Sequence, residues 1–185
     1  EEEYRSGLAE VAKVALALHP DLLASLAGDA RAIAARDPSV LEPLVARCVR
    51  AKGDVVAADE RDADARLVLN YGHTVGHALE RIDGFAGRSH GEAVAVGMRV
   101  AAALAVRLGI AGEALVTAHA AALASVGLDD VGALPEVDEV LAALRMDKKY
   151  AGGVRFVLLE SPGHPRVVEG IDEGDIRHAY RTVAA

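Results

Sequence analysis

Apolar residues recur at helical spacing along most of this chain, and no other feature limits its fold as strongly. Between residues 39 and 58, for example, one face of a helix would carry Leu41, Leu44, Val45 and Cys48. The chain has only four tyrosines, two phenylalanines and no tryptophan, so Ala, Val and Leu must fill the core. Small aliphatic side chains suit helices that pack closely together. We therefore predict a mainly α-helical fold.

The same spacing divides the chain into helices and one short β segment. Residues 154–159 and 166–168 are expected to be strands joined by a turn at 161–165. We predict Ser6 as the N-cap of the first helix. No linker or repeat interrupts the chain, so residues 1–185 should form a single multihelical domain with a small β-hairpin near the C-terminus. The expected helices cover residues 3–18, 20–26, 29–36, 39–58, the histidine-rich segment after 70, 89–109, 112–126, 136–146 and 172–183.

Charge and composition argue against several classes of protein. The net charge is −8 and there is no basic stripe, so we expect no binding to nucleic acid. A phosphorylated substrate would need a local cluster of cations. The most apolar segment, residues 93–108, contains two arginines and is too short to span a bilayer. The single cysteine, Cys48, excludes an intrachain disulfide, and the chain opens on three glutamates where a signal peptide would be basic. We therefore expect a cytoplasmic protein without a membrane partner.

Two histidines that lie four residues apart mark the most distinctive stretch of the sequence. His73 and His77 would share one face of a helix, about one turn apart. Gly72 and Gly76 precede them, and the missing side chains would let another group lie close against this turn. A third histidine, His90, falls at the expected start of the next helix, where the dipole disfavours a protonated imidazole. Such a pair can hold a divalent metal, although two histidines that serve only in the core or at the surface would give the same pattern.

Glu10 offers a carboxylate to the same site. It lies three residues before Lys13 on a helix with few other charges, so both side chains should face the same side. One carboxylate and two imidazoles would give three ligands and an open position, as in catalytic zinc sites. We choose Glu10, His73 and His90 as these ligands. His77 would then remain as a free acid–base group.

The few lysines form the second half of the expected site. The chain has four lysines against sixteen arginines, and a compact ammonium suits an anionic ligand. The alternative is that these lysines are ordinary surface residues. We expect Asn70 to bind a substrate hydroxyl, and we interpret His119, which lies among alanines, as structural. The expected contacts to a carboxylate or phosphate are Lys13, Lys52, Arg66, Lys148 and Lys149.

Several segments, in order along the chain, resemble the 3-dehydroquinate synthase family. The chain is similar to the C-terminal, mostly helical domain of that enzyme, which binds metal and substrate. On this resemblance, the family's N-terminal NAD-binding domain is absent from the chain, in agreement with the lack of a glycine-rich dinucleotide loop. The matching segments are GLAEVAK at residues 7–13, Lys52 with VVAADE at 55–60, Arg66, LNYGHTVGHALE at 69–80, HGEAVAVGM at 90–98 and DKK at 147–149.

The resemblance implies a role for each candidate residue. Glu10, His73 and His90 correspond to the ligands of a Zn²⁺ or Co²⁺ ion. Asp62 stands where the family usually has a glutamate that accepts a proton, and residues 64–65 stand where it usually has Gly-Leu. The positions that correspond to substrate contacts are Lys13, Lys52, Arg66, Asn70, His77 and one of Lys148 and Lys149.

The implied reaction is the second step of the shikimate pathway, in aromatic amino acid biosynthesis. A phosphorylated keto acid, 3-deoxy-arabino-heptulosonate 7-phosphate, becomes 3-dehydroquinate and phosphate, and NAD, bound mainly by the other domain, is used catalytically. The resemblance also implies a homodimer and a carbon–oxygen lyase, and we expect this chain by itself to be inactive. The alternatives are another sugar phosphate cyclase such as aminodehydroquinate synthase, a metal-dependent polyol dehydrogenase, or a non-catalytic helical domain that only binds metal.

Overall fold

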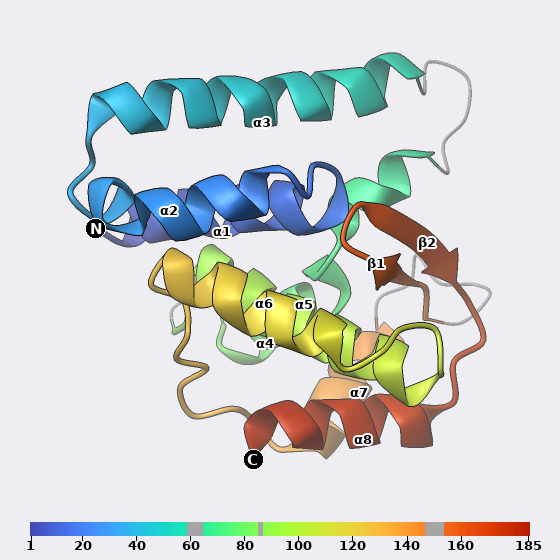
Figure 1. Ribbon diagram of the computed structural model, residues 1–185. Coiled ribbons are helices and arrows are strands. Elements are labelled where there is room, and N and C mark those ends of the chain that lie inside the picture. Colours follow the sequence, from blue (N-terminus) through green and yellow to red (C-terminus); the bar gives the residue numbers. More distant parts are fainter. Residues whose placement is uncertain (59–64, 85–86, 147–153) are drawn as a thin grey trace.

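Helices stacked in layers make up most of the molecule. The computed structural model describes residues 1–58, 65–84, 87–146 and 154–185. Figure 1 shows α3 on one outer side, α1 and α2 beneath it, α4 to α6 in the middle, and α7 and α8 on the opposite side. A two-stranded hairpin lies at one edge of this stack. The prediction of a mainly α-helical fold with a small C-terminal hairpin is confirmed.

The helices and strands follow the expected order along the chain. One short 3₁₀ helix, η1, leads into the histidine-rich segment. The strands β1 and β2 pair in an antiparallel manner, with Phe156 opposite Val168. The bounds are α1 Glu2–Ala17, α2 Leu22–Ala34, α3 Pro38–Ala58, η1 Ala65–Asn70, α4 His73–Ile82, α5 His90–Arg107, α6 Ala114–Ser125, α7 Val137–Met146, β1 Phe156–Ser161, β2 His164–Val168 and α8 Glu173–Ala184.

Two helices form the centre of the core because they are apolar on nearly all sides. The second half of α1 is buried from Val11 to Ala17, and most residues of α5 are buried as well. Helix α5 packs against α1, α4, α6 and α8 and against β1. Both helices carry candidate site residues, Glu10 and His90, so these side chains are attached to the helices that form the centre of the core. Within the described residues, no helix is long and apolar enough to cross a membrane.

Two local predictions are wrong. The segments 20–26 and 29–36 form one continuous helix, α2, because Gly28 lies on its exposed face, where a missing side chain does not break the backbone hydrogen bonds. Ser6 does not cap α1, which already begins at Glu2. Its hydroxyl instead accepts a hydrogen bond from the backbone N–H of Gly91 at 3.2 Å. Ser6 therefore ties α1 to the first turn of α5, close to His90.

The glycines of the histidine-rich segment let the backbone at the start of α4 approach the backbone of α5. This close approach accounts for the glycines without a ligand. Helix α5 lies directly against the start of α4. A Cβ atom added to Gly97 would lie 1.9 Å from the carbonyl oxygen of Gly72, a distance that no relaxed structure tolerates. Gly72 itself has a φ of +79°, which side chains other than glycine rarely adopt. The close approach of α4 and α5 therefore fixes where His73, the next residue, is placed.

Candidate metal centre

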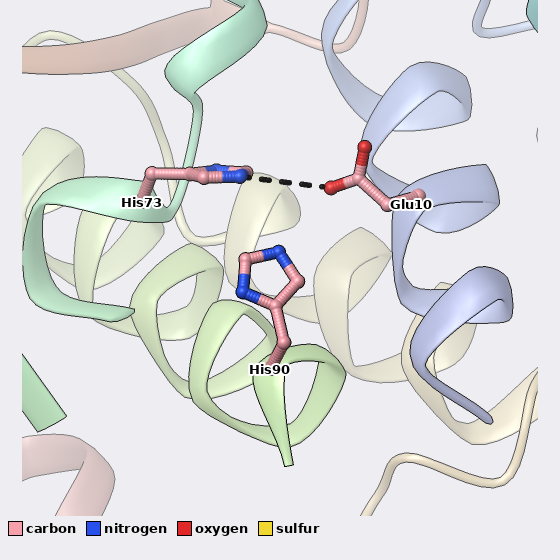
Figure 2. Close-up of side chains that lie close together, drawn as sticks. All are labelled: Glu10, His73 and His90. Atoms are coloured by element: carbon pink, nitrogen blue, oxygen red, sulfur yellow. Dashed lines mark ion pairs between the residues drawn. The ribbon is translucent and has the colours of Figure 1, made fainter. Parts of the chain in front are cut away.

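Three elements far apart in the sequence bring a carboxylate and two imidazoles together. Glu10 comes from the middle of α1, His73 is the first residue of α4, and His90 is the first residue of α5. One ligand atom from each of the three lies within 4.8 Å of the other two. Figure 2 shows the three side chains pointing toward one another across the junction of these helices. The predicted ligand set thus converges in space, and its binding of a metal remains our proposal.

The backbone around His73 leaves one ring nitrogen available. Nδ1 of His73 lies 3.1 Å from the carbonyl oxygen of Tyr71. A carbonyl can only accept, so Nδ1 must carry the hydrogen, and Nε2 keeps its lone pair. That Nε2 lies 3.7 Å from Oε1 of Glu10. Burial, with a smaller contribution from the positive charge of Lys13, lowers the pKa of His73 to about 4. The imidazole is therefore neutral at pH 7, as a metal ligand must be.

A capping box at the start of α5 places His90. Ser89 is the N-cap of α5, and its hydroxyl accepts a hydrogen bond from the backbone N–H of Glu92. The carboxylate of Glu92 accepts a hydrogen bond from the backbone N–H of Ser89 at 2.9 Å, which completes a capping box. His90 is then the first helical residue, as predicted. Its Nδ1 lies 3.0 Å from Oε1 of Glu80 on α4.

Two ammonium groups hold Glu10 in its ionised form. Nζ of Lys13 lies 2.9 Å from Oε1, and Nζ of Lys52 on α3 lies 2.5 Å from Oε2. Burial alone would raise the pKa of Glu10, but the charge of Lys13 and the hydrogen bond from Lys52 outweigh it and lower this pKa to about 2. The prediction that Glu10 and Lys13 face the same side is confirmed, and Lys13 is only 4% exposed.

The residues present fit a divalent ion such as Zn²⁺ or Co²⁺. Oε1 of Glu10 is buried and has no well-aligned hydrogen bond, although the Lys13 ammonium is near, so this oxygen retains a free acceptor position. The oxygen points at the available Nε2 of His73. One carboxylate oxygen with two imidazole nitrogens is a ligand set typical of zinc enzymes that keep an open position.

Comparison with known proteins places the chain in a family. Residues 7–150 match the family described as 3-dehydroquinate synthase C-terminal. The match covers most of the chain and includes Glu10, His73 and His90. The chain belongs to this family. The resemblance that the motifs suggested is therefore confirmed at the level of the family.

Relatives of the 3-dehydroquinate synthase family agree with this assignment. The chain is 43% identical over 182 residues to a 3-dehydroquinate synthase of Corynebacterium jeikeium, covering 97% of this chain and 49% of that protein. A 3-dehydroquinate synthase of Salinibacter ruber is 40% identical over 190 residues, with the same coverage of 97% and 49%. The chain thus spans about half the length of these curated relatives.

Two solved structures share the fold. One is a 2-deoxy-scyllo-inosose synthase complexed with carbaglucose-6-phosphate, NAD⁺ and Co²⁺, with a TM-score of 0.83 and 28% identity over 97% of this chain and 51% of that chain. The other is a 2-epi-5-epi-valiolone synthase of Streptomyces hygroscopicus subsp. jinggangensis with NAD⁺ and Zn²⁺ bound, with a TM-score of 0.85 and 25% identity over 98% and 51%. Both are cyclases of sugar phosphates, which confirms the predicted superfamily.

The remaining candidate residues of this family member are exposed wherever the structure describes them. His77 is exposed beside the cluster, with its ring centre 5.3 Å from that of His73. Arg66 and Asn70 are both exposed on η1, and Asn70 borders a small pocket with Thr74 and Arg155. The predicted proton acceptor Asp62 and the predicted substrate contacts Lys148 and Lys149 lie outside the described residues.

Two side-chain contacts in the structure were not predicted from the sequence. The hydroxyl of Tyr71 lies 2.6 Å from Nε2 of His119, while Nδ1 of His119 donates to the carbonyl oxygen of Leu115 at 2.7 Å. His119 is structural, as predicted, but its partner lies 48 positions away and nothing in the sequence indicates it. The contact of Glu80 with His90 did carry a signal, because Glu80 follows His73 by seven residues on the same helix face.

The buried His119 predicts how stability depends on pH. Burial lowers its pKa from 6.5 to about 4. The unfolded chain therefore takes up a proton at a higher pH than the folded chain, so this stabilisation is complete above about pH 6.5 and is lost as the pH falls to about 4. The shift corresponds to about 3 kcal/mol of the free energy of unfolding. His73 acts with the same sign in the same window.

We expect His119→Gln to remove about half of the loss of unfolding free energy between pH 7 and 4.5, because glutamine does not titrate and its amide oxygen can accept the hydrogen bond from Tyr71 in place of Nε2. Urea unfolding of the parent chain and the variant at several pH values between 7 and 4.5 measures it. An equally steep decline in both proteins would contradict the assignment.

Proposed function

We propose that this chain is the metal- and substrate-binding part of a 3-dehydroquinate synthase, which converts 3-deoxy-arabino-heptulosonate 7-phosphate into 3-dehydroquinate and phosphate. The observation that carries the proposal is the convergence of Glu10, His73 and His90, with two lysine ammoniums on the same carboxylate. Support comes from relatives of 43% and 40% identity that are named 3-dehydroquinate synthase. Two solved structures with this fold contain NAD⁺ together with Co²⁺ or Zn²⁺.

In this proposal the burial and charge of each residue decide whether it binds the metal or the substrate. A divalent ion held by Glu10, His73 and His90 would supply Lewis-acid polarisation of a substrate oxygen, and NAD, held mainly outside residues 1–185, would supply redox capacity. The ammonium of Lys13 is buried, so solvent screens its attraction for an anionic substrate group only weakly. Lys52 is 40% exposed and would meet the substrate from the side of α3.

The remaining candidates would bind the substrate or move protons. His77 is exposed one turn beyond His73 and would accept or donate a proton at a substrate oxygen. Arg66 would pair with the substrate carboxylate, since guanidinium and carboxylate form two parallel hydrogen bonds. Asn70 would bind a hydroxyl. From the family resemblance alone, we propose Asp62 as proton acceptor and one of Lys148 and Lys149 as a substrate contact.

The main rival is a cyclase that acts on another sugar phosphate. The solved structures of such enzymes are 28% and 25% identical to this chain, below the 43% of the 3-dehydroquinate synthase from Corynebacterium jeikeium. An assay of phosphate release separates the two functions. It uses the full natural polypeptide that contains these residues. Release from the seven-carbon keto acid phosphate, but not from glucose 6-phosphate, supports the proposal. The opposite preference would refute it.

Replacing Lys52 with alanine should separate substrate binding from metal binding. The ammonium contacts Glu10 and repels a cation on the same carboxylate, so its removal leaves metal affinity unchanged or higher. An anionic substrate, by contrast, loses a charge-assisted hydrogen bond, and we expect kcat/KM for phosphate release to fall by at least about 10-fold. Zinc content and phosphate release are measured on the same preparation of the full natural polypeptide, because we expect residues 1–185 by themselves to be inactive.

Glu10→Gln is the matched control for this experiment. It removes the negative charge that Lys52 contacts, and it should lose metal as well as activity. A Lys52→Ala variant that loses its zinc would place Lys52 in the metal site and contradict the proposed division.

A further inference from the structure

The carboxylate of Glu80 lies against the back of His90. Glu80 is in the last part of α4, and its Oε1 lies 3.0 Å from Nδ1 of His90. The Glu80 side chain is 13% exposed, whereas that of His90 is 42% exposed. Among the described residues, His90 is the only partner found for this carboxylate. A largely buried carboxylate with one histidine partner indicates a defined role for that contact.

The contact determines which nitrogen of His90 is available. An ionised carboxylate only accepts hydrogen bonds, so Nδ1 of His90 must carry the hydrogen, and Nε2 keeps its lone pair. In Figure 2 the ring nitrogen of His90 that is farther from the backbone points toward Glu10 and His73. The backbone carbonyl of Tyr71 imposes the same tautomer on His73. Both imidazoles therefore present Nε2 to the same point, each held from behind by an oxygen acceptor.

We propose that Glu80 is a positioning residue of the metal centre, which fixes the tautomer and ring orientation of His90 through the Nδ1–H hydrogen bond. This inference rests on the proposed metal site. His90 needs such a partner more than His73 does, because its ring is more exposed and would otherwise turn or change tautomer in water. A carboxylate behind an imidazole also increases the electron density of the ligand nitrogen.

The tautomer can be read in the metal-free chain by NMR of the imidazole nitrogens at mildly alkaline pH. We expect His90 to carry its hydrogen on Nδ1 in the parent chain and in Glu80→Gln, whose amide oxygen still accepts. In Glu80→Ala the acceptor is gone, and the hydrogen should move to Nε2, the tautomer that free imidazole side chains favour in water. An unchanged tautomer in a folded Glu80→Ala would overturn the inference.

Zinc affinity gives the second readout, by competition with a chelating dye. We expect Glu80→Ala to weaken zinc binding about 10- to 100-fold. Glu80→Gln should recover most of that loss, which a general effect of the mutated position on folding would not produce. Glu42→Ala, which removes an exposed carboxylate on α3, serves as the matched control and should bind zinc like the parent.

The outcomes separate this inference from the proposed function. A parent chain that binds no zinc would refute the metal centre, while the tautomer of His90 would still test Glu80. A parent chain that binds zinc, with Glu80→Ala binding equally well, would overturn the role of Glu80 and leave the metal centre in place. A folded Glu80→Gln that behaves like Glu80→Ala in both measurements would also overturn it, because the acceptor oxygen is still present.

Discussion

His73→Ala should abolish measurable zinc binding by this chain. The imidazole supplies one of three proposed ligands, and its Nε2 faces the buried Oε1 of Glu10 at 3.7 Å. Removing it leaves one carboxylate and one half-exposed histidine, which is too few ligands for a stable zinc site. Loss of a residue that only supports a ligand already costs about 10- to 100-fold, so we expect more than about 100-fold here. Isothermal calorimetry with zinc, or elemental analysis after dialysis, measures it.

An exposed histidine elsewhere on the surface provides the control. His178 lies on α8, outside the ligand cluster, and His178→Ala should bind zinc with the affinity of the parent. Circular dichroism shows whether both variants remain folded. Unchanged zinc content in a folded His73→Ala would refute the assignment of His73 as a ligand.

Gly97→Ala should be among the most destabilising single substitutions in the chain. The new Cβ would lie 1.9 Å from the carbonyl oxygen of Gly72 and 3.1 Å from the backbone nitrogen of Gly76. Both neighbours are backbone atoms, so helices α4 and α5 would have to separate. Overpacking of this kind costs about 1–3 kcal/mol or more, which exceeds the gain of about 1 kcal/mol from alanine's helix propensity. We expect a net loss of about 2 kcal/mol or more, which lowers Tm by at least about 4 °C in a domain of this size.

The same substitution should also weaken zinc binding, because Gly72 is adjacent to His73. Gly28→Ala is the matched control, since Gly28 lies within α2 and a Cβ there meets nothing within 4 Å. It should leave Tm unchanged or raise it slightly. Gly97→Ala with the stability of Gly28→Ala would contradict the close packing of α4 against α5.

The sequence indicated the fold class because the helical spacing of apolar residues is a local pattern, and it indicated the composition of the site because the candidate residues occur in short, recognisable motifs. Helical spacing of apolar residues predicted the helices, and the change of period after residue 153 predicted the hairpin. His90 was expected at a helix start, and the structure places it there. Convergence of Glu10 with the histidines followed from ligand chemistry, and the structure confirms that the three residues lie together.

What the sequence left out depends on contacts between distant segments. The glycines at 72 and 97 belong to one helix crossing, yet each alone looks like a weak point of its own helix. Ser6 resembles a cap, but the backbone N–H that it accepts from belongs to Gly91. Likewise, His119 gives no sign of its bond to Tyr71. Such pairings are set only when α1, α4, α5 and α6 pack together.

X-ray absorption spectroscopy of the zinc-loaded chain tests the central claim most directly. We expect one zinc per chain, with two imidazole nitrogens at about 2.0–2.1 Å and oxygen ligands at about 2.0–2.2 Å. Glu10→Gln and His90→Ala should each change that first shell. A spectrum with sulfur ligands or with no imidazole scattering, or a chain that retains no zinc, would contradict a metal centre built from Glu10, His73 and His90.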